Sequence, residues 1–181
     1  ALPFKLTQAQ LRVLEEIDRD MESNIPMNRL LQGDVGSGKT VIAMIAAYKA
    51  VKSGYQATIM APTAILAIQH MESFCSILEK FGIKCELLIS NITKKKKTEI
   101  LEKLESGEID ILIGTHAILE ENVVFKNLGL VITDEQHRFG VKQRSIIASK
   151  SQNPDIIAMS ATPIPRTLAL ILYGDLDISI I

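Results

Sequence analysis

The chain has 181 residues, which fits one domain and is too short for two ordinary ones. Apolar residues make up 47% and charged residues 23%, a composition typical of globular proteins and unlike that of disordered chains or coiled coils. The net charge of −1 excludes nucleic-acid binding through bulk positive charge, so any such contact must come from local groups. Cys75 and Cys85 are too few for a disulfide framework. With no signal peptide or spanning segment, we expect a cytoplasmic protein.

Short apolar strands alternate with helices along the chain. The expected helices span residues 7–23, 39–53, 63–81, 93–106 and 166–172, and the expected strands span residues 29–32, 56–61, 83–89, 109–113, 130–133 and 156–159. This alternation predicts an α/β fold, with a mostly parallel sheet and helices on both faces. Ligands bind such sheets at the carboxyl ends of the strands. Residues 178–181 form a final strand-like run, so we expect a piece of a longer protein.

A phosphate-binding loop lies between the first predicted strand and the helix that follows it. The segment matches the pattern G-x-x-x-x-G-K-[ST], whose glycines let backbone N–H groups converge on phosphate at a helix N-terminus. The lysine would reach the β- and γ-phosphates, and the threonine hydroxyl would hold Mg²⁺. The predicted nucleotide-binding residues are Gly33, Asp34, Val35, Gly36, Ser37, Gly38, Lys39 and Thr40.

An acidic pair, Asp134 and Glu135, follows the apolar strand at residues 130–133. Alone, two carboxylates after a strand most often cap a helix. Together with the phosphate loop, they instead indicate a metal ligand and a residue that acts on the attacking water. Asp134 would complete the Mg²⁺ shell begun by Thr40, directly or through water. Glu135 would orient or deprotonate the attacking water, so Lys39 and Glu135 are the expected catalytic residues.

The acidic pair continues as Asp-Glu-Gln-His, and with this motif the sequence resembles superfamily 2 helicases and translocases. Further blocks resemble the RecG family of bacterial branched-DNA translocases: residues 2–10, 61–63, 114–117, 138–144 and 160–168, in the order of the family. The transcription–repair coupling translocases share part of these blocks but carry a second glutamate where Gln136 stands. The resemblance implies a RecA-like fold that covers the whole chain.

The resemblance also assigns roles around the nucleotide. Gln10 would contact the adenine edge, with Phe4 and Leu6 near the base. Thr7 and Gln10 equally fit a capping box at the start of the first helix, and one glutamine could serve both. The residues implied to couple hydrolysis to movement are Gln136, His137, Ser160, Ala161 and Thr162.

The resemblance places contacts to the DNA backbone in two loops that follow strands, at Pro62, Thr63, Gly114, Thr115 and His116. Hydroxyl and backbone N–H groups suit sequence-independent phosphate contacts. Thr63 could equally be an ordinary N-cap.

Other polar residues have more than one interpretation. Arg138, Arg144 and Arg166 could contact DNA, contact a partner domain or form surface ion pairs. The lysines at residues 94–97 are interpreted as part of a solvated helix in preference to a DNA-binding patch. His70, on the predicted helix 63–81, is interpreted as a structural residue.

The resemblance implies that residues 1–181 are the helicase ATP-binding domain, the first of two RecA-like motor domains, in an ATP-dependent DNA helicase. Such an enzyme remodels forks and Holliday junctions in recombination and repair, with ATP and Mg²⁺ as cofactors. The expected partners are branched DNA and the second motor domain of the same chain, in a monomer. Without that domain and the N-terminal wedge domain, we expect weak nucleotide binding and almost no hydrolysis. The alternatives are a transcription–repair coupling-type duplex translocase, an RNA helicase, and an ATPase that acts without nucleic acid.

Overall fold

The computed structural model describes residues 2–134, 141–173 and 176–181, and within these ranges seven strands form one parallel sheet. The order of the strands across the sheet is β3-β4-β2-β5-β6-β1-β7. Their bounds are β1 Asn28–Gln32, β2 Gln56–Met60, β3 Cys85–Leu88, β4 Ile111–Gly114, β5 Leu128–Asp134, β6 Asp155–Ser160 and β7 Asp177–Ile180. The expected α/β class with a parallel sheet is therefore confirmed.

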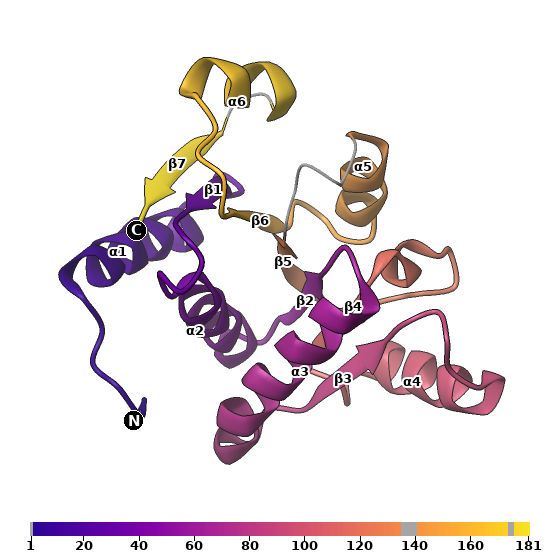
Figure 1. The fold of residues 1–181 in the computed structure, drawn as a ribbon. Coiled ribbons are helices and arrows are strands. Elements are labelled where there is room, and N and C mark those ends of the chain that lie inside the picture. Colours follow the sequence, from indigo (N-terminus) through magenta and orange to yellow (C-terminus); the bar gives the residue numbers. More distant parts are fainter. Residues whose placement is uncertain (1, 135–140, 174–175) are drawn as a thin grey trace.

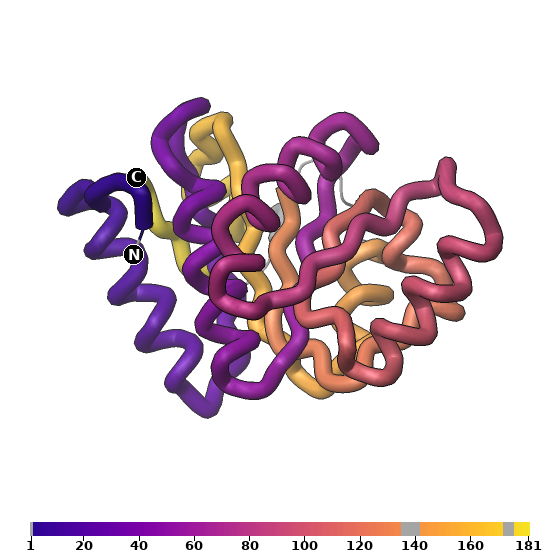
Figure 2. The backbone as a smooth tube through the Cα atoms, turned by 90° about the horizontal axis from the view of Figure 1, so that it is seen from below, coloured from indigo at the N-terminus to yellow at the C-terminus, as the bar shows by residue number. Residues whose placement is uncertain are grey.

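Helices cover both faces of the sheet (Figure 1). The helices are α1 Gln8–Glu22, α2 Lys39–Lys52, α3 Ala64–Leu78, α4 Lys94–Ser106, α5 Val141–Ser149 and α6 Arg166–Tyr173, with 3-10 turns at Glu79–Phe81 and His116–Leu119. One core cluster joins α1, α2 and α3 to the sheet, and a second joins α4 and α5 to the opposite face. Figures 1 and 2 show α1 beside the C-terminal strand β7, with α4 at the other end of the molecule.

The alternation of side chains along β5 decides which face each residue serves. Leu130 and Ile132 belong to the core shared with α1, α2 and α3, whereas Val131 belongs to the core on the opposite face. Successive side chains of a strand point to opposite faces, so Asp134 continues the row of Leu130 and Ile132. Its carboxylate therefore lies on the side of the sheet that carries α2 and α3.

Most element boundaries fall within two residues of the predicted ones. The predicted helix 63–81 divides into α3 and a 3-10 turn, which ends at Gly82 with a left-handed φ of 75°. The helix α5 was not predicted, because its short, mixed sequence carries little helical periodicity. The strand-like run at the C-terminus forms β7, which pairs in parallel with β1. Among the described residues, no helix has the length and apolar character needed to span a bilayer.

Candidate nucleotide-binding and DNA-contact site

The predicted functional segments follow the carboxyl ends of five strands, which meet at one edge because the strands are parallel. The phosphate loop follows β1, Pro62 follows β2, Thr115 follows β4, and β5 ends in Asp134 itself. The loop and the strand β6 are joined directly, since the Gly33 backbone N–H donates to the Ser160 carbonyl oxygen at 3.2 Å.

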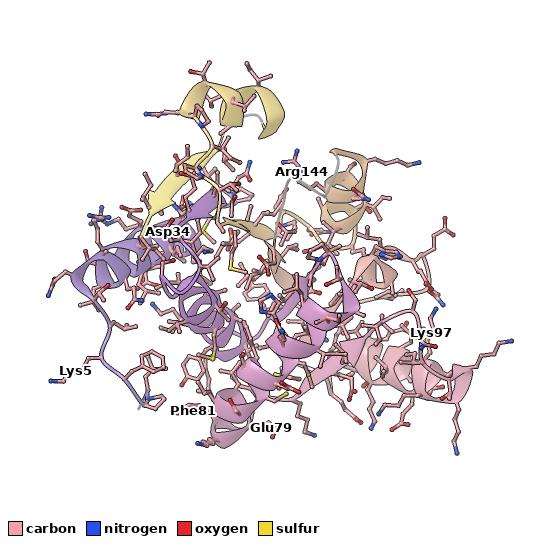
Figure 3. All side chains as sticks on the ribbon, in the orientation of Figure 1. Lys5, Asp34, Glu79, Phe81, Lys97 and Arg144 are labelled. Carbon is pink, nitrogen blue, oxygen red and sulfur yellow. The ribbon has the colours of Figure 1, made fainter. Side chains whose placement is uncertain are left out.

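The phosphate loop is curled around its own lysine. The Lys39 ammonium donates to the carbonyl oxygens of Gly33 at 2.5 Å and Asp34 at 3.0 Å. Two glycines make the turn possible, because Gly36 has a φ of 83° and Gly38 a φ of 92°, a region that other residues rarely occupy. Figure 3 labels Asp34 between β1 and α2. The lysine is therefore held within the loop at the start of α2.

The loop also carries donors that a phosphate group requires. Ser37 Oγ is buried and has no hydrogen-bond partner among the described residues. A Cβ atom at Gly33 would lie 2.4 Å from this oxygen, so only glycine fits beside it. Thr40 stands in the first turn of α2, where backbone N–H groups lack helical partners. These features fit a nucleotide phosphate with its metal ion.

Gln10 connects the first helix to the phosphate loop. Its Oε1 accepts from the Thr7 backbone N–H at 2.9 Å, and the Thr7 Oγ1 accepts from the Gln10 backbone N–H at 3.2 Å, which completes a capping box. The same side chain donates from Nε2 to the Ser37 carbonyl oxygen at 3.0 Å, and the residue is only 9% exposed. The capping interpretation is therefore confirmed. The adenine contact stays a prediction. Of the two residues expected near the base, Phe4 is exposed and Leu6 packs against the core.

Asp134 lies at the same edge of the sheet as the phosphate loop, two strands away. In the sheet register it pairs with Met159 of β6, which pairs with Leu31 of β1, two residues before Gly33. Two strand spacings separate Asp134 from β1, or about 10 Å. Its side chain is 15% exposed, and its Oδ2 lies 2.7 Å from Nε2 of His70 on α3. Glu135 lies outside the described residues.

His70 is the residue that sequence reasoning undervalued. It was interpreted as structural, yet it contacts the predicted metal ligand. The available signal was its spacing, because it shares the buried face of α3 with Ala67, Phe74 and Leu78. That pattern indicates burial but not which strand the ring meets.

The segment after β6 folds back on itself. Ser160 Oγ lies 3.1 Å from Thr162 Oγ1 and accepts from the Thr162 backbone N–H at 3.3 Å. Met159, next to Ser160, pairs with Asp134, so this segment begins beside the first carboxylate. Ala161 lies between the two hydroxyl residues. The other predicted coupling residues, Gln136 and His137, lie outside the described residues.

The two predicted DNA loops differ in what they expose. Thr63 caps α3 through its hydroxyl, which accepts from the Leu66 backbone N–H at 3.3 Å, and it remains exposed beside Pro62. Thr115 is only 4% exposed, whereas His116 is exposed at the surface. The Thr115 side chain is therefore covered in this conformation, and His116 is the accessible side chain of its loop.

Gly114 has a steric role beside the second DNA loop. A Cβ atom there would lie 2.0 Å from the Leu88 carbonyl oxygen of the neighbouring strand. Only glycine therefore allows β3 and β4 to approach so closely at this end of the sheet.

The remaining basic residues are dispersed. Arg166 is exposed at the start of α6, Arg144 lies on α5, and Arg138 falls outside the described residues. In the lysine run, Lys97 is paired with Glu120, and Figure 3 places it on the α4 side, away from Asp34. This placement supports the interpretation of the run as a solvated surface.

Comparison with known proteins shows that the chain is similar to helicases. The sequence is 58% identical to the ATP-dependent DNA helicase RecG of Bacillus subtilis over 181 residues, which are all of this chain and 26% of that protein. It is 53% identical to the same helicase of Aquifex aeolicus, covering 99% of this chain and 23% of the relative. The chain therefore spans about a quarter of the length of these curated relatives.

Solved structures agree with the sequence comparison. A structure of RecG bound to a three-way DNA junction matches 99% of this chain and 24% of its own, with a TM-score of 0.85 and 50% identity. The DUF1998 helicase MrfA bound to DNA matches with a TM-score of 0.75 at 19% identity, a likeness of fold alone. The sequence model of the DEAD/DEAH box helicases matches residues 7–171. The chain thus belongs to the DEAD/DEAH box helicase family.

Proposed function

We propose that this chain is the ATP-binding motor domain of an ATP-dependent DNA helicase that remodels branched DNA in recombination and repair. The observation that carries the proposal is the phosphate loop with Lys39 held inside it, set at the same sheet edge as Asp134. Its specific form rests on 50% identity, over 99% of this chain, to a RecG bound to a three-way DNA junction.

ATP would bind with its phosphates over residues 33–40. The N–H groups at the start of α2 and the Lys39 ammonium supply the positive charge that the phosphates require. Ser37 Oγ, buried without a described partner, offers a further hydrogen bond. Gln10 would contact adenine while it holds Ser37, because its amide can form more than one hydrogen bond at each atom.

A magnesium ion would be held by the Thr40 hydroxyl and the Asp134 carboxylate, which lie on the same face of the sheet. When bound, the ion neutralises phosphate charge that develops during hydrolysis. Glu135 would orient or deprotonate the attacking water, and Lys39 would stabilise the γ-phosphate.

DNA would contact the loops after β2 and β4. Thr63 and the N-terminal N–H groups of α3 provide donors for a phosphate, and His116 is the exposed side chain of the second loop. The segment Ser160–Thr162 would relay movement, because the Ser160 carbonyl oxygen holds the first N–H of the phosphate loop. Gln136 and His137 are proposed as its partners.

The proposed domain is one half of a motor. A second RecA-like domain would supply an arginine against the transferring phosphoryl group, a contribution of about 10³–10⁵ in rate. We therefore expect the 181-residue chain alone to hydrolyse ATP barely and not to translocate. Turnover by this chain at the rate of the complete protein would contradict that expectation.

The test is a rearrangement assay with the complete protein that contains this chain. A Holliday junction and a replication-fork analogue with fluorescent arms are mixed with ATP and Mg²⁺, and arm exchange is followed over time. The proposal predicts exchange by the wild-type protein and its loss in Lys39→Ala. Displacement of proteins from linear duplex without arm exchange would support a transcription–repair coupling-type translocase, and unwinding of RNA duplexes would support an RNA helicase.

A further inference from the structure

His70 occupies a buried position on the helix that faces the end of β5. It shares the sheet-facing side of α3 with Ala67, Phe74 and Leu78, at the spacing of successive helical turns. The side chain is 10% exposed, and its Nε2 lies 2.7 Å from Oδ2 of Asp134. Asp134 is directed to this face because it continues the row of Leu130 and Ile132. The contact therefore joins two elements 64 positions apart in sequence.

The direction of this hydrogen bond follows from the chemistry of its two groups. An ionised carboxylate can only accept, so the imidazole donates from Nε2. Phe74, one turn further along α3, packs against the ring. The two ring centroids are 6.4 Å apart with an interplanar angle of 87°, an edge-to-face contact. Asp134 thus meets a donor whose own rotamer is held by packing.

We propose that His70 is a positioning residue for the metal-binding carboxylate of Asp134, an inference that rests on the proposed function of the site. By occupying Oδ2, the imidazole fixes the rotation of the carboxylate and leaves Oδ1 to face the metal or its bound water. Groups that hydrogen-bond to metal ligands fix the orientation of those ligands. Their loss typically weakens metal affinity about 10- to 100-fold.

The same contact would connect the proposed DNA-contact loop to Asp134 through α3. Thr63 caps the N-terminus of α3, where DNA is proposed to bind, and His70 follows seven residues later. At a rise of 1.5 Å per residue these two positions lie about 10 Å apart along one helix. A shift of α3 on DNA binding would therefore move the donor that holds Asp134.

The test compares Mg²⁺-dependent nucleotide binding in variants of the complete protein. Affinity for a non-hydrolysable ATP analogue is measured by fluorescence, once in Mg²⁺ and once in EDTA. In His70→Leu we expect the gain in affinity produced by Mg²⁺ to fall about tenfold, with affinity in EDTA unchanged. His70→Gln places an amide N–H near the original Nε2, and we expect it to recover most of the gain.

Two controls separate positioning from stability. Leu78→Val loosens the same buried face of α3 but lies about two turns from the imidazole, so we expect a lower Tm and a largely retained effect of Mg²⁺. A double-mutant cycle with Asp134→Asn isolates the pair, because His70→Leu should have little further effect once the carboxylate is gone.

The outcomes are distinct for the two proposals. If the wild-type protein shows a Mg²⁺ effect that His70→Leu leaves intact, the positioning role is overturned and the proposed function stands. Equal losses in His70→Leu, His70→Gln and Leu78→Val also overturn it, because they would indicate a structural role alone. If the wild-type protein shows no Mg²⁺ effect at all, the proposed function fails, and the inference fails with it.

Discussion

Gln10 offers a direct test of how the first helix supports the phosphate loop. The substitution Gln10→Ala removes two hydrogen bonds made by the side chain, one to the Thr7 backbone N–H and one to the Ser37 carbonyl oxygen. A nucleotide-binding role alone predicts no loss of stability in the nucleotide-free protein. The observed contacts predict a loss, because Gln10 is nearly buried in that state.

The magnitude follows from the two bonds. Each contributes about 1 kcal/mol, so Gln10→Ala should lower the free energy of unfolding by about 2 kcal/mol. For a domain of this size the Tm should then fall by about 4–8 °C. The assay is thermal unfolding of the 181-residue chain without nucleotide. Gln8→Ala is the matched control, because Gln8 lies in the same first turn of α1 but is exposed.

A second substitution separates the cap from the loop. Gln10→Glu keeps an oxygen for the Thr7 N–H but replaces the donor to the Ser37 carbonyl with another acceptor. We expect a Tm below that of the wild type and a weakened affinity for ATP. An unchanged Tm in both Gln10→Ala and Gln8→Ala would refute the bridging role of Gln10.

Three further substitutions follow from the site and its surroundings. Lys39→Ala should lower DNA-stimulated ATP hydrolysis in the complete protein by about 100-fold or more, measured at steady state, and near-normal turnover would contradict its role. Gly36→Ala should lower the free energy of unfolding by about 1 kcal/mol, because this residue has a positive φ. Gly38→Ala should lower it further, because the added Cβ would also lie 2.2 Å from Nε2 of Gln10. Equal Tm values for the two variants would contradict this difference. Burial raises the pKa of the Asp155 carboxyl above its ordinary value of 3.8. At pH values above the raised pKa, the carboxyl is ionised in the folded state, and its burial then costs stability. Asp155→Asn should therefore raise the Tm more at pH 7 than near pH 3 in paired melting curves, and a lower Tm at pH 7 would contradict the burial effect.

The fold was largely predictable because buried parallel strands appear as short apolar runs. β2 is buried along its whole length, and its sequence lacks the alternation of a half-exposed strand. The helix α5 was missed because its residues show little amphipathic pattern. The order of the strands could not be predicted, since apolar runs do not specify which neighbours they pair with.

The site was predictable where a local motif carries the chemistry. The phosphate loop and Asp134 are adjacent to their strands in sequence, so position alone placed them at one edge. The contact of His70 with Asp134 depends on the neighbours of β5 and on the rotation of α3, which are properties of the folded chain. The burial of Thr115 is likewise set by packing and has no sequence signal.

The most direct measurement of the central claim is steady-state ATP hydrolysis by the complete protein. Three-way junction DNA, linear duplex DNA and RNA are compared, with Glu135→Gln as the background. If this chain is the motor domain of a branched-DNA helicase, the junction should stimulate hydrolysis far more than linear duplex or RNA, and Glu135→Gln should abolish that stimulation. Hydrolysis that responds to none of the three nucleic acids would contradict the account.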